Sequence, residues 1–180
     1  AAVPAFVVNC AGVSGMQALA DVTEAEWDRV FAVNVKGVVF TIQAAARHMV
    51  PAGKGGAIIS IASGAGRRGV PGASAYAASK AAVISITQST AQELIPHRIR
   101  VNAIAPGAVR TPMWQEVEKR FNAVLGDAVG SAETVQVAAT PAGRMSTPAD
   151  YVGAALYLGT AESDYVVGQT LNVDGGMHMC

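Results

Sequence analysis

Short apolar runs alternate with longer stretches of mixed polarity along the whole chain. The short runs occupy residues 4–10, 57–62, 99–105 and 169–173. Their largely apolar character predicts strands that are buried on both faces, as in parallel sheets. The longer stretches predict helices that begin after Thr23, at about residue 74 and at Pro148. Strands alternating with helices indicate an α/β fold, with a doubly wound, mostly parallel, Rossmann-like sheet.

The first predicted helix has an unusual polar residue on its apolar side. Thr23 and Glu26 have capping-box spacing, so the helix begins after Thr23 and extends to about Met49. One apolar stripe is predicted for Trp27, Val30, Phe31, Val38, Ile42, Ala45 and Met49. Asn34 falls on that stripe, where a buried amide is costly unless it is hydrogen-bonded. Gly37 follows and predicts a local distortion of the helix. Asn34 is either a satisfied structural amide or a functional one.

Two regions depart from the regular alternation. Residues 110–147 are the least regular, with a short helix expected near 114–124 and the character of a covering insertion. The N-terminus has no Gly-rich phosphate turn between a first strand and a helix, which a dinucleotide-binding fold needs. Residues 1–180 are expected to be the C-terminal portion of a single longer domain, without its first strands, an expectation that rests on a family resemblance as much as on this pattern.

Composition restricts the classes of partner. Lys plus Arg and Asp plus Glu both number 13, so neither nucleic acid nor an anionic membrane is expected as a partner. The chain has only two cysteines, so no disulfide framework is expected, and its histidines are not clustered, so no metal site is expected. The first residues have no basic leader, which together with the few cysteines predicts a cytoplasmic location. No apolar stretch has transmembrane length. The charged fraction of only 14% is compatible with a homo-oligomer.

Tyr76 and Lys80 are the first candidate catalytic residues. They stand four positions apart at the start of a predicted helix, so their side chains share a face. Lowering a tyrosine pKa from about 10 to about 7.5 requires about 3.4 kcal/mol. An ammonium about 5 Å away supplies roughly that amount at an effective dielectric of about 20. Tyr76 could therefore act as a general acid/base, although this spacing alone also describes a packing tyrosine beside a solvated lysine.

Ser63 strengthens the catalytic interpretation. It lies 13 residues before Tyr76, at the carboxyl end of the strand 57–62, and a Gly-rich loop follows it. Ligands of open α/β sheets bind at the carboxyl ends of strands. A hydroxyl at this place could bind the substrate oxygen on which Tyr76 acts. Considered alone, Ser63 could also be a turn or capping residue.

The ordered set of motifs resembles the short-chain dehydrogenase/reductase family. It comprises Asn9-Cys10-Ala11-Gly12, Asn34, Ser63, Tyr76-Ala77-Ala78-Ser79-Lys80, Pro106-Gly107 and the terminal Asp174-Gly175-Gly176. The resemblance implies that Tyr76 transfers the proton, Lys80 lowers its pKa and holds the nicotinamide ribose, and Ser63 orients the substrate. Asn34 would hold a water that connects Lys80 to solvent.

The same resemblance implies a cofactor-binding surface. Its residues would be Asn9, Ala11, Gly12, Tyr76, Lys80, Pro106, Gly107, Val109 and Thr111. The family usually has Asn where this chain has Cys10. NAD is expected by analogy with polyol and diol dehydrogenases, and NADP is not excluded, since the strand that decides between them is not in this sequence.

The implied reaction is hydride transfer between a nicotinamide cofactor and a secondary alcohol or ketone, most similar to members that act on small polyols or diols. Substrate contacts would come from Ser63, Gly64, Tyr76 and Trp114, although Trp114 could simply pack the covering segment. Gly64 stands where those members often carry Gln, so the implied pocket lacks a hydrogen-bonding side chain at this position. Family members are usually tetramers. The tail 177–180 could lie at such an interface or be frayed.

Two alternatives remain open. One is an NADPH-dependent ketoacyl or other carbonyl reductase of the same family. The other is a non-catalytic interaction module that lacks the phosphate-binding half and exposes an apolar sheet edge.

Overall fold

Four parallel strands form the centre of the molecule. The structure is a computed structural model that describes residues 3–126 and 130–179. The strands are β1 (Phe6–Asn9), β2 (Gly56–Ile61), β3 (Ile99–Pro106) and β4 (Thr170–Val173), and they pair in that order. All three pairings are parallel, which confirms the predicted sheet. Their carboxyl ends therefore lie at one edge of the sheet.

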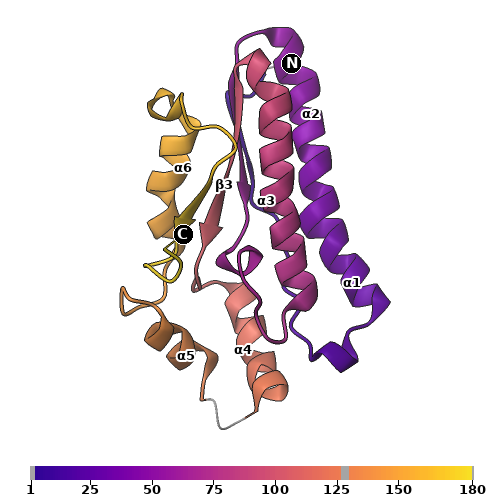
Figure 1. The fold of residues 1–180 in the computed structure, drawn as a ribbon, viewed down its shortest axis with the longest axis vertical. Coiled ribbons are helices and arrows are strands. Elements are labelled where there is room, and N and C mark those ends of the chain that lie inside the picture. The colour runs from indigo at the N-terminus through magenta and orange to yellow at the C-terminus, as the bar shows by residue number, and fades with distance from the viewer. Residues whose placement is uncertain (1–2, 127–129, 180) are drawn as a thin grey trace.

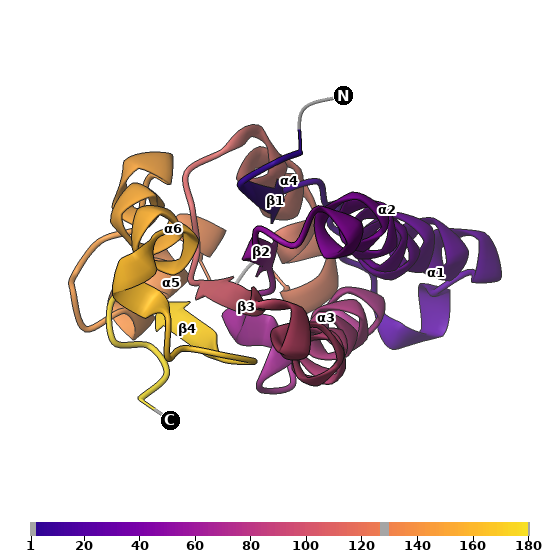
Figure 2. The ribbon, with the colours of Figure 1, turned by 90° about the horizontal axis from the view of Figure 1, so that it is seen from above.

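Helices cover both faces of the sheet (Figures 1 and 2). One face carries α2 (Gly37–Ala52) and α3 (Ser74–Leu94), and α1 (Glu24–Phe31) precedes α2 in the same helical stretch. The other face carries α6 (Val152–Gly159). The side chains of β2 and β3 alternate between two cores. Ile58 and Val101 pack in the α2/α3 core, whereas Ile59 and Ile104 pack against α6. Burial on both faces explains why these strands read as continuous apolar runs.

The helical stretch from Glu24 to Ala52 is distorted at the predicted place. The Thr23 hydroxyl accepts a hydrogen bond from the Glu26 amide, which confirms the cap. A π-helical segment, Ala32–Lys36, separates α1 from α2 directly before Gly37. The predicted stripe is correct except at its start, because Trp27 is 38% exposed and stacks on Phe31 instead of entering the core.

By length and composition alone, this same stretch could cross a membrane, because one 18-residue window within it has a mean hydropathy of 1.2. The prediction that no uninterrupted apolar stretch has transmembrane length is not contradicted, because charged residues such as Lys36 and Arg47 interrupt this one. Core helices of α/β sheets pass the same test, and the buried residues Val38, Ile42 and Met49 pack in the sheet core.

Two helices stand at the carboxyl end of the sheet (Figure 1). They are α4 (Pro112–Leu125), which was expected near 114–124, and α5 (Ala132–Ala139), which was not predicted. Thr147 and Asp150 form a capping box, as Pro148 suggested, but the first turn is a 3-10 helix and α6 begins only at Val152. Short 3-10 turns occupy Leu19–Asp21, Gly64–Gly66, Ile95–His97, Pro148–Tyr151 and Ala161–Ser163.

Candidate active site

The predicted catalytic residues meet at the carboxyl edge of the sheet. Ser63 follows β2 by two residues, and Tyr76 and Lys80 lie on the first two turns of α3. Ser63 is close enough to the Tyr76 phenol to lower its pKa, and the Lys80 ammonium lies 5.7 Å from the Tyr76 ring centroid. The three side chains thus form one cluster, as their spacing in the sequence suggested.

The turn after β2 explains how Ser63 reaches Tyr76. The Ser63 hydroxyl accepts a hydrogen bond from the Ala65 amide at 3.2 Å and caps the 3-10 turn Gly64–Gly66. A Cβ at Gly66 would lie 2.7 Å from the Lys80 carbonyl carbon, so only glycine allows the turn to press against α3. Ser63 is therefore both the capping residue of a turn and a partner of Tyr76.

Lys80 is a buried lysine with a lowered pKa. Its residue is 5% exposed, and its ammonium donates a 2.8 Å hydrogen bond to the Ile61 carbonyl at the end of β2. Burial lowers the pKa of Lys80 to about 8, because the charged form loses its hydration. Nearby Cys10 opposes this shift.

The pKa of Tyr76 departs from the expectation. Burial of the phenol raises its pKa above the ordinary value, and the hydrogen bond with Ser63 lowers it in part. The predicted lowering by Lys80 is thus not found in the chain alone. The physical reason is that the ring is desolvated, and the ammonium that should compensate is desolvated with it.

Asn34 is a fully buried amide with a complete set of protein partners. Its Nδ2 donates to the Val13 carbonyl and the Ser79 hydroxyl, both at 3.0 Å, and its Oδ1 accepts from the Val13 amide at 2.8 Å. The side chain therefore ties the loop after β1 to α3. This geometry supports the structural interpretation of the amide, and the water connecting Lys80 to solvent stays a prediction.

The loop after β1 lies next to the lysine. Asn9 is buried and donates from Nδ2 to the Ser60 hydroxyl at 3.2 Å, while Ala11 is exposed. A Cβ at Gly12 would lie 3.5 Å from both the Asn34 Oδ1 and the Lys80 Nζ. Gly12 thus stands beside the catalytic cluster, on the surface that the cofactor was expected to contact.

The loop after β3 closes another side of the same edge. Gly107 donates from its amide to the Val173 carbonyl at 3.3 Å, and a Cβ there would lie 3.1 Å from the Asp174 Cα. Pro106 ends β3, Val109 pairs with Ser146 in an isolated bridge, and Thr111 is the N-cap residue of α4. The cofactor contacts assigned to these residues stay predictions.

Two substrate candidates have unexpected surroundings. Trp114 packs with Phe121 and Met16 in a small cluster, which supports the packing interpretation, although its indole Nε1 is buried without a partner among the described residues. Gly64 faces the imidazole of His178, which sequence reasoning did not select. The expectation of a frayed tail is wrong for His178, whose side chain is 8% exposed, while Cys180 lies outside the described residues.

The tyrosine, lysine and serine cluster at the carboxyl edge of a parallel α/β sheet, which is where open sheets of this kind bind their ligands and where a proton-transferring group can reach one. Residues 4–178 match the family described as enoyl-(acyl carrier protein) reductase. The chain belongs to the short-chain dehydrogenase/reductase family, which confirms the resemblance.

Individual relatives include several polyol and diol dehydrogenases. The chain is 46% identical to a sorbitol dehydrogenase of Cereibacter sphaeroides and 43% identical to a galactitol 2-dehydrogenase of Agrobacterium fabrum. Both alignments cover 97% of this chain and 68% of the relative. A third relative, L-2,3-butanediol dehydrogenase of Corynebacterium glutamicum, is 40% identical over 95% of this chain and 66% of its own length.

Solved structures agree with this assignment. A short-chain dehydrogenase/reductase of Mycobacterium marinum is 37% identical with a TM-score of 0.86, covering 97% of this chain and 65% of that one. A gluconate 5-dehydrogenase of Burkholderia cenocepacia, in complex with NADP and tartrate, has a TM-score of 0.84 at 35% identity and covers 96% and 64%. A 3-oxoacyl-[acyl-carrier protein] reductase of Brucella melitensis with bound NAD has a TM-score of 0.82 at 37% identity and covers 99% and 64%. The chain thus spans about two thirds of the length of the proteins it matches.

Proposed function

We propose that the protein carrying this chain is an NAD(P)-dependent dehydrogenase that interconverts a secondary alcohol and a ketone, with a small polyol or diol as substrate. The observation that carries this proposal is the cluster at the carboxyl edge of the sheet, in which Ser63 lowers the Tyr76 pKa and the Lys80 ammonium lies 5.7 Å from the Tyr76 ring centroid. Family membership and the polyol and diol dehydrogenases among the relatives support it.

The residues of this chain divide the chemistry in a simple way. A nicotinamide cofactor supplies the hydride chemistry when bound. The Tyr76 hydroxyl holds the proton that the substrate oxygen gains or loses, and the Ser63 hydroxyl orients that oxygen. Because burial raises the Tyr76 pKa, the phenol keeps its proton at neutral pH, so proton donation during carbonyl reduction is the easier direction. Alcohol oxidation is expected to become faster as the pH rises.

The cofactor assignment fits the groups that the site presents. An ammonium has three donors, and the Ile61 carbonyl takes one of the three at Lys80. The remaining donors suit the hydroxyl groups of a ribose, and Gly12 leaves room beside the ammonium. Asn9, Ala11, Pro106, Gly107, Val109 and Thr111 would complete the binding surface. NAD is our first choice by analogy with polyol and diol dehydrogenases, and NADP is the second, since one similar structure holds NAD and another holds NADP.

The test uses the complete protein, purified and incubated with NAD or NADP and a panel of sorbitol, galactitol and 2,3-butanediol. Formation of reduced cofactor, followed by absorbance, is expected with at least one of these substrates and with NAD in preference to NADP. The Tyr76→Phe variant is the matched control for contaminating dehydrogenases. Absence of turnover with every substrate and both cofactors would overturn the proposal.

The carbonyl reductase alternative is decided in the same assay. A relative of this class, the (3R)-3-hydroxyacyl-CoA dehydrogenase of Canis lupus familiaris, is 40% identical. Faster turnover of a 3-oxoacyl thioester with NADPH than of any polyol with NAD would favour it. A protein that binds neither cofactor would instead support the non-catalytic interaction module.

We also propose a cytoplasmic homotetramer. Apolar side chains remain exposed on two helices, with Phe40 at 53% on α2 and Leu156 at 55% on α6. Two such surfaces on different faces are what a tetramer needs to cover. Light scattering on the complete protein tests this assembly, and a monomer would overturn it. Cell fractionation tests the location.

A further inference from the structure

The tail after β4 is folded back and fixed by one carboxylate. Asp174 accepts hydrogen bonds from the Gly176 amide at 3.1 Å and from the His178 amide at 2.9 Å. The same carboxylate lies 2.7 Å from the His178 Nδ1, and the Asn172 amide group donates to the His178 carbonyl at 3.0 Å. The side chains of Asp174 and His178 are only 4% and 8% exposed. The imidazole therefore has one defined position.

That position is directly against the turn that carries Ser63. A Cβ built on Gly64 would lie 2.6 Å from the His178 Cε1 and 2.9 Å from its Nδ1, closer than real atoms approach. The imidazole thus occupies the volume that a side chain at position 64 would need. Since Asp174 holds the ring, the ring cannot simply swing away.

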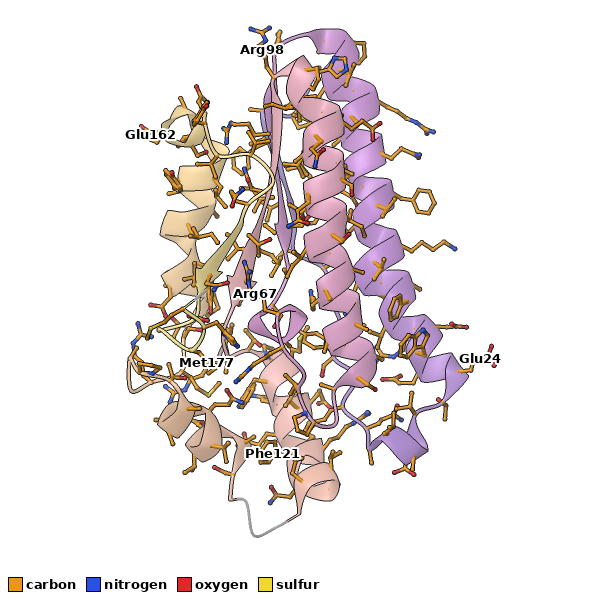
Figure 3. All side chains as sticks on the ribbon, in the orientation of Figure 1. Glu24, Arg67, Arg98, Phe121, Glu162 and Met177 are labelled. Atoms are coloured by element: carbon orange, nitrogen blue, oxygen red, sulfur yellow. The ribbon has the colours of Figure 1, made fainter. Side chains whose placement is uncertain are left out.

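The neighbouring loop is tied to the same part of the molecule. The Arg67 guanidinium donates to the Thr170 carbonyl at 2.6 Å, and the Arg68 guanidinium lies 3.5 Å from the Met177 sulfur. Arg67 and Met177, labelled in Figure 3, mark the two sides of this junction. The turn after β2 is therefore held between α3 on one side and the C-terminal tail on the other.

The ring acts on the turn by packing. The Nδ1 faces Asp174, and the Nε2 is buried without a partner among the described residues. Among the described residues, no hydrogen bond links the imidazole to the turn. The ring therefore acts on the turn through steric contact alone. A packed atom constrains its neighbour because protein interiors leave little room for adjustment.

We propose that His178 is a positioning residue of the active site: its imidazole, fixed by Asp174, packs on Gly64 and so holds the Ser63 hydroxyl at its place beside the Tyr76 phenol. The inference rests on the proposed function, because Ser63 and Tyr76 must be the reacting groups for their geometry to matter. It adds a residue that lies 115 positions from Ser63 in the sequence.

The first test is a volume exchange in the complete protein. His178→Ala is expected to lower kcat on the order of 10- to 100-fold with little change in KM, because small misplacements of reacting groups cost this much. His178→Phe keeps a ring against Gly64 but loses the bond to Asp174, so it should recover kcat in part. Gly64→Ala should be impaired alone and improved by adding His178→Ala, which empties the space. Met179→Ala, at an 83% exposed neighbour, is the control.

The outcomes decide the inference in both directions. Wild-type kcat in His178→Ala, equal damage in the Ala and Phe variants, or no improvement in the double variant would each overturn it. Should His178→Ala fail to fold, His178→Asn takes its place, since Asn can pair with Asp174 but is too short to cover Gly64.

The second test needs no substrate and so separates this inference from the proposed function. Tyrosine labelled at the Cζ carbon is titrated by NMR, and the Tyr76→Phe spectrum identifies the Tyr76 signal. The Ser63 hydrogen bond lowers the Tyr76 pKa, so losing it in His178→Ala should move the titration to higher pH. An unchanged titration would overturn the positioning role even in an active enzyme. A shifted titration in an inactive protein would support it while the proposed function fails.

Discussion

The catalytic cluster and the covering segment lie at the same edge of the sheet but are built differently. Around the cluster, Lys80 and Asn34 are buried and have hydrogen-bond partners from the end of β2 and from the loop after β1. The covering segment, α4 and α5, buries only Phe121 and Ala132 in a small apolar cluster, and its Trp114 Nε1 has no partner in the described part of the chain. The reacting groups are thus fixed by the fold, whereas the segment over them depends on few contacts.

This difference implies that chemistry and specificity reside in separate parts of the molecule. A buried network of satisfied polar groups holds its atoms in one arrangement, because leaving any member unpaired is costly. A small apolar cluster can adjust or be exchanged at less cost. Substitutions in the cluster should therefore affect kcat or the free energy of unfolding strongly, and substitutions in α4 should mainly affect substrate binding.

The largest effect is expected from Tyr76→Phe. Removing the phenol hydroxyl removes the proton donor and should lower kcat by about 10²–10⁴-fold, the usual contribution of general acid–base catalysis. The fold should persist, since the ring remains and only its bond to Ser63 is lost. Steady-state kinetics and thermal unfolding of both proteins measure the two effects. A kcat within tenfold of the wild type would mean that Tyr76 is not the proton donor.

Lys80 provides a test through the pH dependence of stability. Its pKa is about 8 in the folded protein and 10.5 in the ordinary state, so the unfolded chain binds more protons between these values. Stability therefore rises with pH through this window. Relative to Lys80→Met, the wild-type free energy of unfolding should increase by about 3 kcal/mol from pH 7 to pH 10.5.

Urea unfolding of the cofactor-free protein measures this difference at both pH values. Lys54→Met, at an exposed lysine, is the control and should show no comparable pH dependence. A constant difference between wild type and Lys80→Met would show that Lys80 is not desolvated as the structure indicates.

Asn34→Ala should destabilise the cluster by removing three hydrogen bonds at once. Truncation leaves the Val13 amide, the Val13 carbonyl and the Ser79 hydroxyl without that partner. Each buried group left unpaired costs about 1–3 kcal/mol, and water entering the space offsets part of it, so a loss of about 3 kcal/mol is expected. Urea unfolding measures it against Asn122→Ala, an exposed residue of α4. Equal stability of the two variants would contradict the network.

The catalytic cluster could be predicted from the sequence more completely than the region around it. Buried strands produce continuous apolar runs, and the residues 74–94 form α3 as expected, because these patterns are local. Asn34 was placed correctly as a buried amide on an apolar stripe. What local pattern cannot reveal is a contact between distant segments.

Two findings show this limit. The helix α5 was missed because eight residues with only one fully buried position give a weak periodic signal. The sequence left the tail with His178 between an interface and a frayed end, because the burial of His178 depends on Asp174 and on the space that Gly64 leaves free. The sequence shows that residue 64 is a glycine without a Cβ. It does not show that the imidazole of His178 packs in the space left by the missing Cβ. The pKa of Tyr76 was misjudged for a related reason, since the degree of burial is a property of the fold.

The smallest effect is expected from Trp114→Phe in the covering segment. The substitution removes a buried N–H that has no partner among the described residues and retains an aromatic ring in the cluster with Phe121. The gain from removing an unpaired donor and the loss of packing volume oppose each other, so the free energy of unfolding should change by less than about 1 kcal/mol. If the indole also covers the substrate, KM rises by up to about tenfold while kcat is retained. Trp27→Phe, which changes the exposed tryptophan of α1, should leave KM unchanged. A large fall in kcat for Trp114→Phe would show that the covering segment shapes the chemistry itself, and would remove the division between the two regions.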